Sequence, residues 1–202
     1  MKFFLVWVFV TALTAVSALA ALGMPWPHEG SDLTPDPRIT FSRLDNGVRL
    51  AIFPNSNPKS RISLRLHVAA SSLNENEAER GLAHFVEHMA FNGTTHFPSG
   101  KLVEFLQRQG MSFGDDVNAT TSYSSTIYKL ELGSNSPENL REALQVFRDY
   151  ADGILFDPAA VDRERGIILA EARVRDTGAY RRETDQLIAL YGYLRDSTYH
   201  KL

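Results

Sequence analysis

Two histidines and a glutamate stand close together in the segment His84-Phe85-Val86-Glu87-His88. Residues four positions apart on an α-helix lie on one face, so the imidazoles of His84 and His88 could share one metal ion. Histidine nitrogens bind Zn²⁺ at about 2.0–2.1 Å. Glu87 projects from a nearby edge of that face, where its carboxylate could reach a metal-bound water without binding the metal itself. This H-x-x-E-H spacing inverts the H-E-x-x-H zinc motif and predicts metal-assisted hydrolysis.

The other metal ligands must come from a restricted set, because the chain has no cysteine. A catalytic zinc site needs a third protein ligand and one position left open for water. The segment 161–175 offers Glu164 and Glu171, which are seven residues apart and therefore stack on one helical face. The apolar stretch 166–170 between them is expected to be buried, and a glutamate beside it is costly unless paired or bound to metal. Spacing alone does not choose between the two glutamates.

The elements that position these residues predict an α+β fold. A turn is expected at 45–47, and the strand 48–53 after it is expected to form a hairpin with the strictly alternating strand 62–68. Another strand is expected at 123–132, and helices at 77–89, 101–109, 159–175, 183–194 and after the cap at Ser136. This order indicates a largely antiparallel sheet with helices packed on it and the metal motif on a buried helix.

Length and composition exclude some classes of protein. The 202 residues are 44% hydrophobic and 22% charged, which is typical of a globular chain and not of a disordered one. The formal net charge of -3 gives no electrostatic reason to expect nucleic acid as a partner. Prolines among glycine, serine and aspartate predict an extended linker over residues 21–40, so the folded domain is expected over 41–202.

The first residues have the pattern of a targeting segment. Residues 3–22 are almost purely apolar and follow Lys2, and Ala18-Leu19-Ala20 has the small-x-small pattern of a secretory cleavage site. Residues 1–20 are therefore predicted to be a signal peptide, and the mature chain to be exported to a periplasm or secreted. The alternative is a retained membrane anchor, because about 20 apolar residues can just span a bilayer.

Six short segments, in this order along the chain, carry a resemblance to a known family: 44–47 (Leu-Asp-Asn-Gly), 81–89 (Gly-Leu-Ala-His-Phe-Val-Glu-His-Met), 91–94 (Phe-Asn-Gly-Thr), 118–121 (Asn-Ala-Thr-Thr), 126–128 (Thr-Ile-Tyr) and 164–171 (Glu-Arg-Gly through Glu). Together they resemble the N-terminal catalytic domain of the pitrilysin family of zinc peptidases, which includes insulin-degrading enzyme and mitochondrial processing peptidase. The resemblance covers about residues 41–202.

This resemblance implies a role for each residue of the site. It implies that His84, His88 and Glu171 bind the zinc ion and that Glu87 is the catalytic base. Glu164 looks like the family's second acidic position, outside the metal ligands, where a carboxylate can orient a histidine or tune the metal. The implied activity is that of a zinc-dependent metalloendopeptidase.

The resemblance also implies partners. It places Asn118 and Ala119 on an edge strand beside the metal, where the backbone of a peptide or unfolded polypeptide substrate adds as an extra strand. Family members carry a second, similarly folded domain that closes over the site, so a second pitrilysin-like domain or subunit is expected here. The chain ends where the family's first domain is usually unfinished, which favours a fragment. The alternative function is a non-catalytic or partner-dependent subunit, although degenerate zinc motifs are the usual mark of such relatives.

Overall fold

The computed structural model describes residues 25–111 and 117–191, in two compact units that divide at residue 59. The predicted signal peptide, or anchor, lies outside the described residues, as does the end of the helix expected at 183–194. Among the helices of the described ranges, none has both the length and the apolar character needed to cross a bilayer.

The first unit contains a β-hairpin of β1 (Thr40–Arg43) and β2 (Arg49–Ile52), preceded by the short 3-10 helix η1 (Pro27–Gly30). Trp26 packs edge-on against Phe41 of β1, with ring centroids 4.9 Å apart. The predicted hairpin between 48–53 and 62–68 is wrong. The short turn that follows β1 fixes β2 as its antiparallel neighbour, and the 62–68 strand pairs with a distant segment instead.

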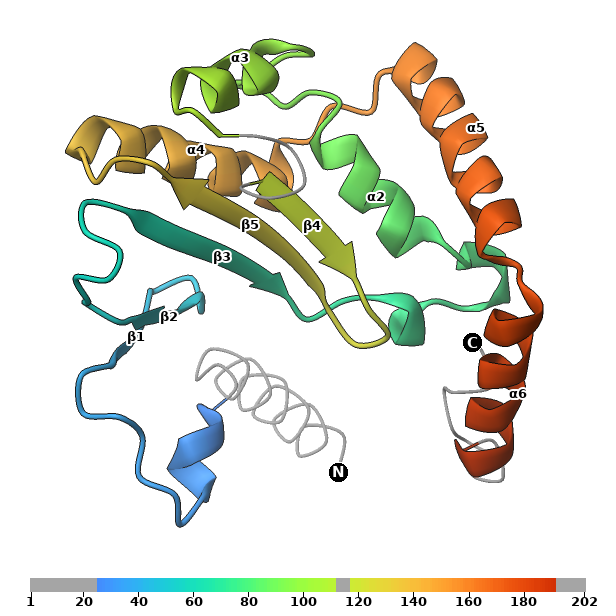
Figure 1. Ribbon diagram of the computed structural model, residues 1–202, viewed down its shortest axis with the longest axis horizontal. Helices are drawn as coiled ribbons and strands as arrows, with labels where there is room; N and C mark the ends of the chain where they lie inside the picture. Colours follow the sequence, from blue (N-terminus) through green and yellow to red (C-terminus); the bar gives the residue numbers. More distant parts are fainter. Residues whose placement is uncertain (1–24, 112–116, 192–202) are drawn as a thin grey trace, which may run out of the picture. The chain divides into compact units, whose positions relative to one another are not determined.

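The second unit is built on a three-stranded antiparallel sheet (Figure 1). Its strands are β3 (Ile62–Val68), β4 (Val117–Thr121) and β5 (Thr126–Leu132), in the order β3-β5-β4. Strand β5 starts later than expected, because Ser122 and Ser125 form the turn between β4 and β5, with the Ser122 amide donating to the Ser125 carbonyl at 2.9 Å. Strand β4 is an edge of this sheet.

The described residues of the second unit also form five α-helices: α2 (Leu82–Ala90), α3 (Lys101–Arg108), α4 (Pro137–Asp152), α5 (Pro158–Arg175) and α6 (Gly178–Tyr191). The expected helix 77–89 is shorter than predicted, because Gly81 has a φ of 89° that interrupts it. The buried carboxylate of Glu75 accepts the backbone N–H groups of Gly81 and Ala83 at 2.8 and 2.7 Å, and so caps α2 where it now begins. The mixture of helices and antiparallel strands confirms the predicted α+β class.

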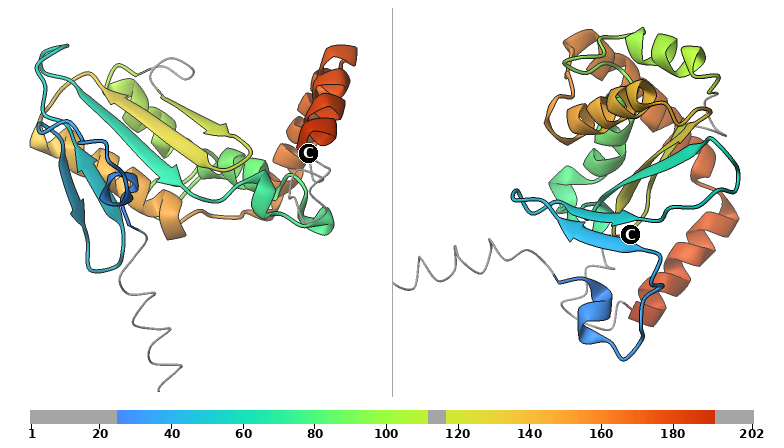
Figure 2. Two further views of the ribbon diagram at one scale, coloured as in Figure 1. Left: turned by 90° about the horizontal axis from the view of Figure 1, so that it is seen from below. Right: turned by 90° about the vertical axis from the view of Figure 1, so that its left-hand side faces the viewer.

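The hydrophobic core lies between one face of the sheet and the helices. Alternate residues of β5 are buried, and Tyr128, Leu130 and Leu132 belong to the core. Helices α3 and α4 bury Phe105 and Val146 against them, and Figure 2 shows further views of this layer. The opposite face of β5 exposes Ile127, so the strand is covered on one side.

A buried acid ties the loop between α2 and α3 to α4. Asp149 of α4 is 2% exposed and accepts hydrogen bonds from Thr94 Oγ1 (2.6 Å), the His96 backbone N–H (2.8 Å), His96 Nδ1 (2.7 Å) and Gln145 Nε2 (2.9 Å). Burial raises the pKa of Asp149, but the hydrogen bonds from Thr94, His96 and Gln145 outweigh it and hold the pKa below its ordinary value.

We expect Asp149→Asn to lower the free energy of unfolding at pH 7 by about 1.5–3 kcal/mol, the usual worth of hydrogen bonds to a charged group. Because the folded-state pKa is lowered, the carboxylate stabilises the fold above its unfolded pKa of about 3.9 and loses this effect as pH falls through the folded value. The difference between the two proteins in urea unfolding should therefore shrink below about pH 4.

The matched control is Asp152→Asn, which removes an exposed carboxylate of the same helix that pairs with Arg148. It should change the free energy of unfolding by less than about 1 kcal/mol. Equal stability of Asp149→Asn and the unchanged protein across the pH range would show that the buried acid does not hold the loop.

Candidate metal centre

Helices α2 and α5 lie side by side and bring the predicted metal-site residues together (Figure 1). His84, Glu87 and His88 come from α2, whereas Glu164 and Glu171 come from α5. Glu87 and Glu164 are each only 8% exposed. The side chains of the two histidines are 19% exposed and that of Glu171 is 36% exposed, so the cluster is open to solvent on one side.

The ligand atoms of His84, His88 and Glu171 all lie within 4.8 Å of one another. The two Nε2 atoms are 3.2 Å apart. Nε2 of His84 lies 3.7 Å from Oε2 of Glu171, and Nε2 of His88 lies 3.7 Å from Oε1 of the same carboxylate. Tetrahedral bonds of about 2.0–2.1 Å hold neighbouring ligand atoms roughly 3.3–3.4 Å apart. Two imidazoles and one carboxylate in this arrangement therefore fit a zinc ion with one coordination position left open.

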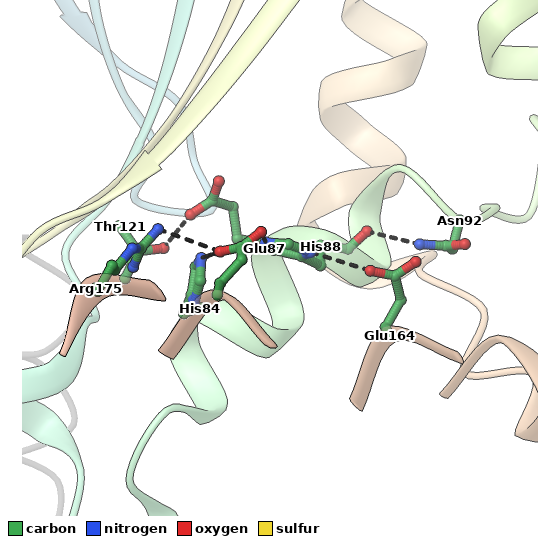
Figure 3. A network of polar contacts seen from close by, with 8 residues as sticks. His84, Glu87, His88, Asn92, Thr121, Glu164 and Arg175 are labelled. Atoms are coloured by element: carbon green, nitrogen blue, oxygen red, sulfur yellow. Dashed lines mark hydrogen bonds and ion pairs between the residues drawn. The ribbon is translucent and has the colours of Figure 1, made fainter. Parts of the chain in front are cut away.

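Glu164 contacts the side of His88 that faces away from His84. Its Oε2 lies 3.0 Å from Nδ1 of His88 (Figure 3). Because an ionised carboxylate can only accept, this contact places the ring proton on Nδ1 and leaves the lone pair of Nε2 directed at His84 and Glu171. The two glutamates that spacing could not separate thus stand in different places: Glu171 among the candidate ligand atoms, Glu164 behind one of them.

Electrostatics also favour metal binding. Burial lowers the pKa of His84 below its ordinary value, and His88 and Arg175 lower it further, against the opposing effect of Glu87 and Glu171. A lowered pKa keeps the imidazole neutral at neutral pH, and the neutral form is the one that binds a metal. Arg175, one turn after Glu171, donates from Nη2 to its Oε2 at 3.2 Å and restrains that carboxylate.

The remaining predicted residues lie on or against β4. Asn118 and Ala119 are in the middle of this edge strand, and the Ala119 backbone N–H donates to Oδ1 of Asn118 at 2.8 Å. Thr121 ends the strand and donates from Oγ1 to Oε2 of Glu87 at 2.5 Å (Figure 3). The sequence reasoning missed Thr121, although it lies two residues from Ala119 and therefore on the same face of the strand.

The expectation that residues 166–170 are buried is wrong. Ile167 and Leu169 are 46% and 51% exposed, and only Ile168 in this stretch is half-buried. The reason is that α5 meets α2 through the face that carries Glu164 and Glu171, which leaves the side chains of Ile167 and Leu169 outside this contact. The burial of Glu164 comes from contact with α2, not from the apolar run beside it.

The comparisons with known proteins agree with this geometry. The sequence profile of Insulinase (Peptidase family M16) matches residues 50–189. The probable zinc protease PqqL of Escherichia coli is 37% identical over 166 residues, which are 82% of this chain and 18% of the relative. The PqqL protein of Haemophilus influenzae is 39% identical over 140 residues, 69% of this chain and 15% of that one. The chain thus spans less than a fifth of these relatives.

Solved structures give the same picture. The first half of the periplasmic protease PqqL from Escherichia coli superimposes with a TM-score of 0.71 at 38% sequence identity, over 78% of this chain and 33% of that one. Pitrilysin superimposes with a TM-score of 0.61 at 29% identity, over 76% of this chain and 16% of that one.

We expect one zinc ion per chain, lost when His84, His88 or Glu171 is changed to alanine, because each change removes one of the three candidate ligands. Glu164→Ala should keep the ion but bind it about 10- to 100-fold more weakly, since it releases the orientation of His88. Elemental analysis and chelator competition measure both effects.

The matched control for these variants is Glu138→Ala, an exposed glutamate near the start of α4, which should retain full zinc. Full zinc in Glu171→Ala together with loss in Glu164→Ala would reverse the roles of the two glutamates.

Proposed function

The chain belongs to the insulinase family of peptidases, family M16, and on that premise we propose that it carries the catalytic centre of a zinc-dependent metalloendopeptidase. The observation that carries the proposal is the convergence of His84, His88 and Glu171, whose ligand atoms lie within 4.8 Å of one another. Glu87 lies on α2 with the two histidines. These three residues would hold the zinc ion. Bound zinc supplies a water of lowered pKa and polarises the carbonyl of the scissile bond.

Glu87 is the proposed general base. It lies on α2 near the two histidines but is not one of the candidate ligands, so its carboxylate is free of the metal and can accept a proton from the attacking water. The same carboxyl group then delivers the proton to the leaving amine of the cleaved peptide. Its low exposure keeps bulk water from competing for the carboxylate.

Strand β4 is the proposed docking edge for the substrate. In the described residues β4 pairs with β5 on one side, and its other side is available to an added strand. The N–H of Ala119 donates to Oδ1 of Asn118 and could donate to a carbonyl of the substrate instead. An extended peptide or unfolded polypeptide is the class of substrate that such an edge accepts.

We propose that a second pitrilysin-like domain or subunit completes the enzyme. The chain matches 33% of a structure that is itself the first half of PqqL, which supports a larger active protein. The candidate ligands are partly exposed, as expected of a site that another domain covers. A non-catalytic subunit is the alternative, and the intact set of His84, Glu87, His88 and Glu171 argues against it.

Export is proposed for the mature chain. The relative PqqL is a periplasmic protease, and residues 1–20 have the pattern of a signal peptide. Expressed in a bacterium, the chain should have Ala21, or a residue immediately next to it, as its first residue, which mass spectrometry of the N-terminal peptide measures. An intact Met1 on membrane-bound protein would establish the anchor instead.

The mechanism is tested by Glu87→Gln in a protein that carries this chain together with the second domain. Zinc content and the fold should be unchanged, because Glu87 is not a ligand. Hydrolysis of unstructured peptides should fall by ~10²–10⁴-fold, because an amide cannot accept the proton of the water. Glu104→Gln, on the exposed face of α3, is the control and should leave the rate unchanged.

Inactivity of the complete, zinc-loaded protein on a broad peptide library would favour the non-catalytic subunit. The same assay on the 202-residue chain alone tests whether hydrolysis requires a second domain. We expect this chain to bind zinc but to hydrolyse peptides little or not at all. Turnover by the short chain at ~1–10³ s⁻¹, the range typical of enzymes, would show that no second domain is needed.

A further inference from the structure

The shortest polar contact of the proposed base is with the sheet and not with the metal-binding helix. Thr121, the last residue of β4, donates from Oγ1 to Oε2 of Glu87 at 2.5 Å (Figure 3). A hydroxyl that donates to a carboxylate forms a charge-assisted hydrogen bond, which is shorter and stronger than a neutral one. It also occupies one of the two carboxylate oxygens, so it selects which oxygen is left for another partner.

The Thr121 hydroxyl is itself held firmly. Thr121 pairs with Thr126 across the β4–β5 hairpin, and their Oγ1 atoms are 3.5 Å apart. The buried Thr126 donates in turn to the carbonyl of Ala70 at 3.1 Å. As a β-branched residue, threonine has few χ1 rotamers. The position of Oγ1 is therefore set by the pairing of the sheet.

The turn after Thr121 is fastened from outside the hairpin. The backbone N–H of Leu73 donates to the carbonyl of Tyr123 at 3.0 Å, and the Ser71 hydroxyl donates to the carbonyl of Ser122. Ser71 is buried, so this contact is shielded from water. These bonds tie the turn after β4 to the 3-10 helix η2 (Ser72–Asn74) and the residue before it, and η2 contacts α2.

We propose that Thr121 is a positioning residue for Glu87: its hydroxyl holds Oε2 and presents Oε1 to the water that attacks the substrate. The proposal rests on the proposed function of Glu87 as general base. Geometry is decisive for such a group, because a misplacement of about 1 Å can cost on the order of 10²-fold in rate.

One strand then aligns both partners of the reaction. Asn118 and Ala119 on β4 form the proposed docking edge, and Thr121 lies two residues beyond Ala119 on the same face. The side chains of Ala119 and Thr121 are half-buried, whereas those of Asn118 and Thr120 are exposed, as this alternation requires. Strand β4 would therefore position both the bound peptide and the carboxylate of Glu87.

The test is Thr121→Val in the protein that carries the second domain. Valine keeps the shape of the side chain and removes the donor, so kcat should fall by about 10- to 100-fold. KM and zinc content should not change, because the substitution leaves the backbone of the docking edge and the candidate ligands unaltered. Thr121→Ser restores the hydroxyl and should recover most of kcat, which a merely structural role of the β-branched side chain would not produce.

Thr40→Val is the matched control, because it removes the same hydroxyl from an exposed strand residue that lies outside the docking strand. It should leave kcat unchanged. In a Glu87→Gln background, Thr121→Val should cause little further loss, because the two residues act as one unit. An undiminished kcat in Thr121→Val, or an equal loss in Thr40→Val, would overturn the proposal.

A crystallographic comparison separates this proposal from the proposed function. The zinc-loaded protein and its Thr121→Val and Thr121→Ser variants should differ in the Glu87 carboxylate, which stays on β4 with threonine or serine and leaves it with valine. If the complete protein is inactive, the proposed function fails, and these structures still decide whether Thr121 places Glu87. An unmoved carboxylate in Thr121→Val would show that it does not.

Discussion

The contact between α2 and α5 is the interaction on which the site depends, and its most direct bond joins His88 to Glu164 at 3.0 Å. Neither helix carries a complete metal site, because two imidazoles alone leave the coordination sphere short of a ligand. The hydrogen bond fixes the tautomer of His88, and the same helical face brings Glu171 to the other side of both imidazoles. One helix–helix interface therefore sets both the geometry of the candidate ligands and the tautomer of one of them. The sheet has the corresponding role for the proposed base, since Glu87 accepts a hydrogen bond from Thr121 of β4.

Local features of the sequence were sufficient to predict α3, α4 and α5 to within a residue or two and to predict that His84 and His88 lie on one helix. Ser136 and Asp157 cap α4 and α5 by accepting the backbone N–H groups of Asn139 and Ala160, and such bonds depend only on neighbours in the chain. His84 and His88 share a face for the same reason. Strand pairing was not predictable in this way. Alternation over residues 62–68 determines which side chains face the core, but not the partner strand, and Ile62 pairs with Leu132.

The site shows the same division between local and distant information. Glu164 and Glu171 are equivalent by helical spacing, and only the angle at which α5 meets α2 puts one behind His88 and the other between the two imidazoles. The contact of Thr121 with Glu87 requires in addition the register of β4 against β5. The prediction that residues 166–170 are buried was wrong for a related reason. Apolar composition predicts burial only where another element covers that face, and Ile167 and Leu169 are exposed.

The balance of charge gives a physical reason for the arrangement. Among the charged side chains that the described residues place around His84 and His88, three are carboxylates, Glu87, Glu164 and Glu171, and one is the guanidinium of Arg175. Counted at their formal charges, these four side chains carry two more negative than positive charges, and the lowered pKa of His84 disfavours a compensating positive charge on that imidazole. Partly buried charges of one sign are costly unless they are paired. A divalent cation between the imidazoles and Glu171 neutralises the group, whereas a monovalent cation leaves one charge over. The charges therefore favour the same kind of ion as the ligand atoms do, through an argument that is independent of the distances.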